Sequence, residues 1–186
     1  RKRWILIKKG EFGMATEKIK RPLIAHFLDT SKTATYEDAE WSRIGVNVTE
    51  ASTEYNPQSE TSQDIISDSA STEITGYQPT MPVSQQCTKG DPVFELVTEL
   101  RRKRATLAES NSWLLNVDLW DVTGEDVSAT YKAEVQKVSI QVDTYGGAGG
   151  EAPVQEYTLN FIGDPIPGTV KITSGDPVFT ADSAVV

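Results

Sequence analysis

The sequence is poor in the residues on which most metal sites and many catalytic sites are built. Among its 186 residues there is one cysteine, Cys87, and one histidine, His26. A single cysteine forms neither an internal disulfide nor a cysteine-based metal site, and a lone histidine cannot supply a cluster of histidine ligands. We interpret both residues as structural and expect neither a metal nor a cofactor.

Long hydrophobic runs are also missing. Nothing approaches the roughly 20 consecutive apolar residues that a membrane-spanning helix needs. The basic start of the chain contains only four apolar residues in a row, at 4–7, which is too short for the core of a secretory signal. We therefore expect a single soluble domain with a core of ordinary size, made in the cytoplasm and without a membrane partner.

Positive charge is scarce. The chain holds 18 Lys and Arg against 27 Asp and Glu, a net charge of −9. Residues 1–13 contain five of the basic residues and one of the acidic ones, so the remainder has 13 against 26, or −13. Proteins that bind nucleic acid show the opposite balance. We expect the body of this protein to repel DNA.

The residues before Met14 have an unusual coding potential. The segment Lys8–Glu11 reads Lys-Lys-Gly-Glu, and the codons AAAAAAGGAGAA that can encode it contain a bacterial ribosome-binding purine run. Our hypothesis is that natural translation starts at Met14 and that residues 1–13 are a non-native or mis-called extension. The alternative is a genuine basic arm.

The clearest predicted element is a helix over residues 91–104. Asp91 suits the N-cap and Pro92 the first helical position. The helix has an apolar stripe at helical spacing and a basic end, where the helix dipole favours cations. The stripe is Val93, Leu96, Val97 and Leu100, and the basic end is Arg101, Arg102, Lys103 and Arg104. Since no aromatic residues interleave with the basic end to stack bases, we favour dipole compensation and salt bridges to an acidic neighbour over a nucleic-acid patch.

Most of the remaining chain predicts strands. Alternating apolar residues indicate a long strand over 41–55 and further strands over 113–122, 131–145, 154–162 and 168–173. Residues 14–40 read as an N-terminal arm with at most a short edge strand near Pro22, and 174–186 as a flexible tail. The fold class is therefore mainly β: an antiparallel β-sandwich or barrel over 41–173, flanked by one helix.

Residues 49–77 predict a long extended hairpin arm. Its middle, 56–72, is rich in Ser, Thr, Asp and Glu around the apolar pair Ile65 and Ile66. Such a segment buries too little surface to order itself. Two interpretations stay open: a disordered insertion, or an arm that becomes ordered when it binds a partner.

Catalysis has weak support in the sequence. The 27 acidic residues allow a carboxylate-dependent hydrolase, but no pair is singled out by its spacing. The glycine-rich segment 146–150 links two predicted strands and precedes no helix, so we interpret it as a hairpin turn rather than a phosphate-binding loop. We expect no catalytic residues.

Several motifs taken in order resemble the phage tail tube proteins, or major tail proteins, of long-tailed phages and prophages. The likeness runs from about Lys18 to Ile172. The motifs are Lys20-Arg-Pro-Leu-Ile-Ala-His-Phe-Leu-Asp29, the strand start at 41–45, Tyr55-Asn-Pro-Gln, Tyr77-Gln-Pro-Thr, Lys89-Gly-Asp-Pro-Val-Phe, Leu100-Arg-Arg-Lys-Arg and Asn160-Phe-Ile-Gly-Asp-Pro165. Residues 1–13 lie outside this pattern.

The resemblance implies a self-assembling structural subunit of the virion tail. Such subunits form hexameric rings that stack into a tube, contact other tail proteins, and let DNA pass without specific binding. The arm would reach a neighbouring subunit, and the acidic excess would give the lumen negative charge. The expected inter-subunit contacts are Tyr55, Ile65, Ile66, Tyr77, Arg101, Arg102 and Arg104. The alternatives are a monomeric β-sandwich that acts as a binding or surface module and, as a less favoured one, the hydrolase.

Overall fold

The computed structural model describes residues 16, 18–124 and 129–182. The hypothesis of a Met14 start and an extension over 1–13 lies outside the described residues. Within the described part, no helix has both the length and the apolar character needed to cross a membrane.

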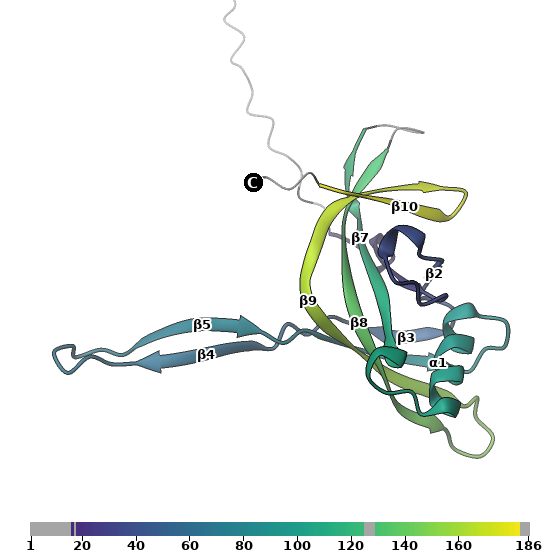
Figure 1. The fold of residues 1–186 in the computed structure, drawn as a ribbon, viewed down its shortest axis with the longest axis horizontal. Helices are drawn as coiled ribbons and strands as arrows, with labels where there is room; N and C mark the ends of the chain where they lie inside the picture. Colours follow the sequence, from purple (N-terminus) through teal and green to yellow (C-terminus); the bar gives the residue numbers. More distant parts are fainter. Residues whose placement is uncertain (1–15, 17, 125–128, 183–186) are drawn as a thin grey trace, which may run out of the picture.

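One curled, fully antiparallel sheet of eight strands forms the body (Figure 1). The strands run in the order β2-β1-β7-β8-β9-β6-β3, and β10 pairs with β9 beside this path. Their bounds are β1 Ile24–Asp29, β2 Trp41–Arg43, β3 Val48–Ala51, β6 Thr80–Gln86, β7 Asn111–Thr123, β8 Thr130–Gly146, β9 Val154–Thr173 and β10 Asp176–Ala181. The described residues also form three short 3-10 helices: η1 Arg21–Leu23 before β1, η2 Tyr36–Asp38 between β1 and β2, and η3 Leu107–Ser110 before β7. The mainly β, antiparallel class predicted from the sequence is confirmed.

Apolar clusters form on both faces of the sheet, and consecutive residues of one strand serve different cores. In β7, Leu114 packs in a cluster with the helix, while Leu115 packs in a second cluster on the opposite face. In β1, Leu28 and Phe27 divide in the same way. This follows from the alternation of side chains along a strand. It explains why apolar residues stand next to each other at 114–115 and 27–28.

The single long helix, α1 Pro92–Lys103, begins and ends as predicted. The Asp91 carboxylate accepts a hydrogen bond from the backbone N–H of Phe94 at 2.9 Å, and Arg104 ends the helix in the left-handed region at φ 51°. The buried side chain of Gln85 donates to the same carboxylate at 2.7 Å and to the carbonyl of Val46 at 3.1 Å. The N-cap is therefore tied to the sheet as well as to the helix.

The prediction of an arm or edge strand for the apolar island near Pro22 was wrong. β1 lies between β2 and β7 and pairs with both. Its residues are buried on both faces, so the run is short and apolar because it is an inner strand. The predicted strand over 41–55 is also broken, because residues 44–47 form a turn in which Asn47 adopts φ 54°.

The C-terminal region contains more strand than expected. The strands predicted at 154–162 and 168–173 are one strand, β9, which pairs with β8 on both sides of a register shift. Gly163, in the first Gly-Asp-Pro after the helix, has φ 69° and lies at this irregularity. A tight turn with positive φ at Ser174 and Gly175 then returns the chain as β10, as type I′ hairpin turns do. Residues 176–181 are therefore not a loose tail.

A single carboxylate organises the segment between β1 and β2. Asp29 is fully buried, and its two oxygens accept hydrogen bonds from the backbone N–H groups of Ser31, Thr33 and Glu40 and from the hydroxyls of Ser31 and Thr33, at 2.7–3.1 Å. Its backbone carbonyl accepts from the buried Ser112 hydroxyl at 2.6 Å. The loop that carries Tyr36 and Trp41 to the second core depends on this residue.

We expect Asp29→Ala to lower the free energy of unfolding by about 3 kcal/mol or more, because buried donors lose their acceptor. Urea unfolding followed by tryptophan fluorescence measures the change. Asp164→Ala is the matched control, since Asp164 is exposed, and it should shift stability by no more than about 0.5 kcal/mol. Equal effects of the two substitutions would contradict this role for Asp29.

Candidate inter-subunit interface

A two-stranded arm projects from the body (Figure 1). Its strands, β4 Pro57–Ser62 and β5 Ser71–Tyr77, pair antiparallel with each other and form a sheet of their own. Every residue of β4 is exposed, as is every residue of β5 except Gly76. The hairpin arm predicted within 49–77 is confirmed, with residues 49–51 in β3 of the body. Of the stretch 56–72, for which disorder was the alternative, residues 57–62 and 71–72 lie in its strands.

The tip of the arm presents two isoleucines to solvent. The backbone N–H of Ser67 donates to the carbonyl of Asp64 at 3.0 Å, which closes a turn with Ile65 and Ile66 at its corners. Their exposed fractions are 104% and 92%, the highest of the large apolar residues in the described part. A turn normally carries polar residues, so this apolar corner is unusual.

The base of the arm is held by Asn56, which has φ 43°. Its side-chain amide donates to the carbonyl of Gln78 and the hydroxyl of Thr80, both at 3.1 Å. Tyr55 and Tyr77 lie at this base with exposed fractions of 61% and 57%. The base is therefore fixed to the body while both rings remain open to solvent.

The arm is uniformly acidic. Residues 57–77 contain Glu60, Asp64, Asp68 and Glu73 and no lysine or arginine. Ile74 adds an exposed apolar side chain to the shaft, with 60% exposure. Sequence reasoning missed Ile74, although its place in a strand with polar neighbours was a usable signal.

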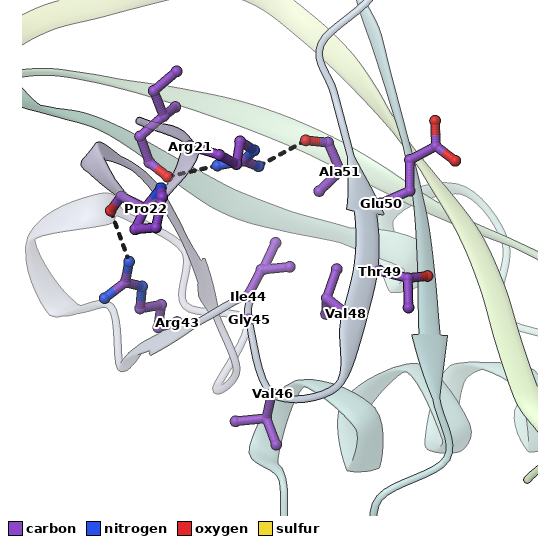
Figure 2. Close-up of a pocket in the computed structure, with 11 residues that line it drawn as sticks. Arg21, Pro22, Arg43, Ile44, Gly45, Val46, Val48, Thr49, Glu50 and Ala51 are labelled. Atoms are coloured by element: carbon purple, nitrogen blue, oxygen red, sulfur yellow. Dashed lines mark hydrogen bonds between the residues drawn. The ribbon is translucent and has the colours of Figure 1, made fainter. Parts of the chain in front are cut away.

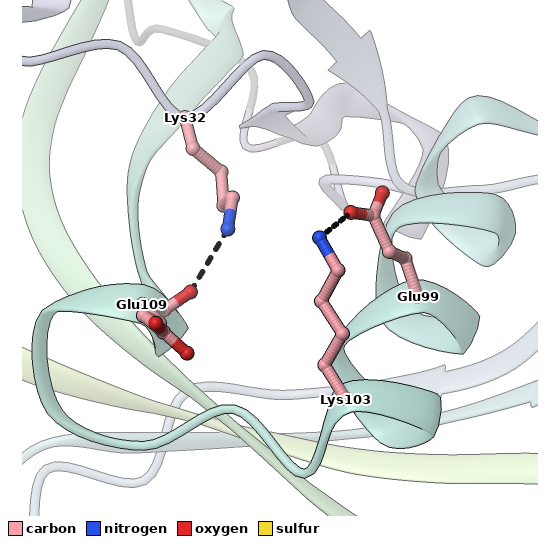
Figure 3. A network of polar contacts seen from close by, with 4 residues as sticks. All are labelled: Lys32, Glu99, Lys103 and Glu109. Atoms are coloured by element: carbon pink, nitrogen blue, oxygen red, sulfur yellow. Dashed lines mark hydrogen bonds and ion pairs between the residues drawn. The ribbon is translucent and has the colours of Figure 1, made fainter.

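The basic end of α1 lies away from the arm (Figure 1). Arg101 is partly buried, with its guanidinium carbon 3.9 Å from the centre of the Tyr145 ring, while Arg102 and Arg104 are exposed. Lys103 pairs with Glu99 one turn earlier, and Lys32 donates to the carbonyl of Glu109 nearby (Figure 3). The hydrogen bond with Glu99 raises the pKa of Lys103 and lowers that of Glu99.

The seven expected contact residues thus fall at three separate places. Ile65 and Ile66 lie at the tip of the arm, Tyr55 and Tyr77 at its base, and the three arginines at the end of α1. The helix forms its ion pair within itself rather than with an acidic neighbour. Among the described residues the structure brings none of these three groups together.

A groove between β2 and β3, the seam groove, was not predicted. The two strands end the sheet order and are joined by the turn at 44–47. The groove has a volume of about 490 Å³ and an apolar floor that includes Ile44 and Val48 (Figure 2). Arg21 and Arg43 lie beside it. Arg43 is next to Ile44 in the sequence, but Arg21 comes from a separate segment, so no spacing signal could have revealed the groove.

Arginine side chains hold the seam together. The Arg21 guanidinium donates to the carbonyls of Ile24 and Ala51, each at 2.7 Å, and so bridges β1 to β3. Arg43 donates to the carbonyl of Pro22 at 3.3 Å (Figure 2). Each guanidinium is thus satisfied by neutral oxygens. In the described residues the one ion pair is Lys103–Glu99. Neither Arg21 nor Arg43 therefore forms an ion pair with a carboxylate.

His26 belongs to a polar chain that crosses three strands. Its Nδ1–H donates to Asn116 Oδ1 at 2.8 Å, and the Asn116 amide donates to Glu134 at 3.1 Å. Burial lowers the pKa of His26 below its ordinary value; the bond to Asn116 and the charge of Asp118 partly oppose this, and Arg21 and Arg43 reinforce it. Among described residues, no group of three or more His, Cys, Asp or Glu could hold a metal ion. The arrangement fits a neutral, structural histidine.

A shallow depression on the outer face of the sheet is acidic. It crosses β3, β6, β9 and β8, has a volume of about 250 Å³, and has no lysine or arginine in its lining. The acids are Glu50, Asp143 and Glu156. Hydroxyls of Thr158 and Thr144 donate at 2.7 Å to Asp143 and Glu156 respectively, which holds these carboxylates in place. We call this surface the acidic face.

The fold as described is a curled antiparallel sheet with one helix and a projecting hairpin. No protein-family model and no curated protein matches the sequence. Ten chains of solved structures match. One comes from the tail of an empty GTA particle computed with helical refinement and C6 symmetry, with a TM-score of 0.51 and 10% identity; the match covers 80% of this chain and 97% of that chain. The likeness to tail proteins expected from the sequence is thus confirmed at the level of the fold.

The burial of His26 predicts a pH dependence of stability. Because its pKa is lower in the folded protein than its ordinary value of 6.5, the unfolded state binds the proton more readily. The stability contributed by the neutral ring is complete above pH 6.5 and is lost as pH falls through the folded pKa. We expect His26→Gln to flatten the decline of unfolding free energy below pH 6.5 in urea titrations. An unchanged slope would contradict this assignment.

Proposed function

We propose that the protein is a structural subunit of a phage or prophage tail tube. In this proposal it assembles into hexameric rings that stack around a central lumen through which DNA passes. The observation that supports it most directly is the exposed arm, β4–β5, with its apolar tip. The fold likeness to a chain of a C6-symmetric tail particle supports the same symmetry here.

Leaving the arm unpartnered is energetically costly. An isolated two-stranded hairpin is at best marginally stable in water, and this one pairs with no other described strand and is almost wholly exposed. Burying an isoleucine side chain contributes about 1.5–3 kcal/mol, and Ile65, Ile66 and Ile74 are all exposed. A neighbouring subunit that covers them would stabilise both the arm and the assembly.

The role is structural rather than catalytic. Lone His26 is buried and committed to Asn116, and it has no nucleophile within its polar chain. Asp143 and Glu156 of the acidic face accept hydrogen bonds from their own sheet, and the face is a shallow, open surface. The hydrolase alternative therefore gains no support from the described geometry.

The acidic face is the surface we assign to the lumen. DNA phosphates gain affinity for a protein when Lys or Arg neutralises them and releases counterions. A surface that carries Glu50, Asp143 and Glu156 without a basic residue in its lining offers no such neutralisation. Its like charge would keep DNA from adhering as it passes.

Deleting the arm tests the proposed assembly. We expect the wild-type protein to form rings or filaments in negative-stain electron microscopy on concentration. A variant in which a short Gly-Ser link replaces residues 57–77 should keep its circular dichroism and remain monomeric, because the body makes its own core. A wild-type protein that stays monomeric at every concentration would favour the binding-module alternative, and assembly of the deletion variant would exclude the arm as the contact.

Charge reversal tests the lumen assignment. We expect assemblies with Glu50→Lys, Asp143→Lys and Glu156→Lys to retain short double-stranded DNA when pelleted at low salt, and to release it as salt rises, since new phosphate contacts release counterions. Wild-type assemblies should retain none.

The matched control for this reversal is Glu37→Lys, Glu109→Lys and Asp164→Lys, three exposed acids outside the acidic face. Assemblies with the acidic-face triple should retain DNA fragments that enter the lumen, and assemblies with the control triple should not, because the control places the same charges elsewhere. Equal retention by both triples would place the acidic face on some other surface of the assembly.

A further inference from the structure

The tip of the arm and the seam groove are complementary in apolar character. The tip presents Ile65 and Ile66 almost without cover. The groove offers the apolar floor already described, and Val46 at its end is 50% exposed. At about 490 Å³ its volume is in the range of about 300–1,000 Å³ that is usual for binding pockets. An exposed apolar pair and an exposed apolar groove are each costly in water, and one contact would cover both.

The two surfaces are also complementary in charge. Asp64 and Asp68 flank the isoleucines, and the whole arm lacks basic residues. Arg21 and Arg43 flank the groove and hydrogen-bond to carbonyl oxygens rather than to carboxylates. Glu50 also lines the groove, but its side chain points away from the floor (Figure 2). Charge complementarity of this kind sets the orientation and partner of a contact.

The shape of the subunit excludes its own tip as the occupant. β3, which lines the groove, runs through residues 52–56 into the arm, and the arm extends away from the body (Figure 1). The tip and the groove therefore lie at opposite ends of one continuous segment. A contact between them joins different copies.

We propose that residues 64–68 of one copy bind in the seam groove of a second copy of this chain. Ile65 and Ile66 lie against the apolar floor, and Asp64 and Asp68 face Arg21 and Arg43. Every copy carries both a tip and a groove, so the contact is head-to-tail and closes into a ring when the rotation between copies allows it. This inference rests on the proposed tube assembly and names the acceptor of its arm.

Disulfide trapping between two variants tests the contact. In a Cys87→Ser background, Ile66→Cys and Val46→Cys proteins are mixed and oxidised with diamide. Because a disulfide needs the two Cα atoms within about 7 Å, we expect mixed dimers about tenfold above those formed by Ile66→Cys with Val178→Cys. Val178 is the control because it is exposed to 61% on β10, outside the groove. Mass spectrometry with one isotope-labelled partner counts the mixed dimers.

A charge change separates a specific contact from chance collision. Arg43→Glu, placed in the Val46→Cys protein, should reduce the mixed dimers by about tenfold, the effect of losing a close charge pair worth about 1.4 kcal/mol. Lys171→Glu makes the same charge change at an exposed site on β9 and should leave the yield unchanged. Mixed dimers equal to the Val178 control, or equal losses from the two charge changes, would overturn the proposal.

The outcomes also distinguish this inference from the proposed function. Wild-type rings that need the arm, together with trapping no better than the control, would keep the tube assembly and remove the seam groove as acceptor. Absence of rings from the wild-type protein would contradict the tube assembly itself.

Discussion

The pairing of β8 with β9 is the interaction on which the rest of the structure depends. These strands are 17 and 20 residues long and pair along nearly their whole length. β7 adds to one side, and β6 and β10 add to the other. One core forms beneath α1, against the first part of β9. The other forms where β9 meets β10. Each core uses a different part of the two strands, so one continuous strand pair supports both cores.

The irregularities of this pair shape the subunit. The pairing register of β8 with β9 changes between Val135 and Lys137, and β9 bulges there at Gly163. The carbonyl of Gly163 accepts a hydrogen bond from Gln136. Further along, Gly168 allows β10 to approach, because a side chain there would lie 2.3 Å from the carbonyl of Thr180 and against the ring of Phe179. A bulge increases the local twist of a strand. The sheet can therefore curl and be covered on both faces without breaking into two domains.

Local chemistry allowed much of the fold to be predicted from sequence. Asp91, Pro92 and the basic last turn identified α1, and alternation identified β7 and β8. Predictions failed where pairing over long distance decides the outcome. β1 was placed at an edge because its strand partners, β2 and β7, cannot be read from its own residues. The strands at 154–162 and 168–173 were predicted as separate, because nothing local shows that β8 pairs on both sides of residues 163–165.

Parts of the candidate interface could likewise be predicted from the sequence and parts could not. Ile65 and Ile66 stood out in sequence because apolar residues inside a polar stretch need an explanation. The seam groove did not, because Arg21 on one side and the segment from Arg43 to Ala51 on the other come together only in the folded sheet. Features of single segments can be read from one sequence, whereas surfaces made by several segments require the fold.

β3 belongs to both halves of the proposed contact, since it lines the seam groove and leads into the arm. Before copies joined in this head-to-tail way close into a ring, the two ends of the chain of subunits are chemically different: one displays an unoccupied acidic tip and the other an unoccupied basic groove. Growth would therefore have a direction, and a terminating protein would need to imitate only one of the two surfaces. A tip bound in the groove would also hold β3 of the accepting subunit in place. Because β3 leads into the arm, the arm of that subunit would be oriented before the next copy binds.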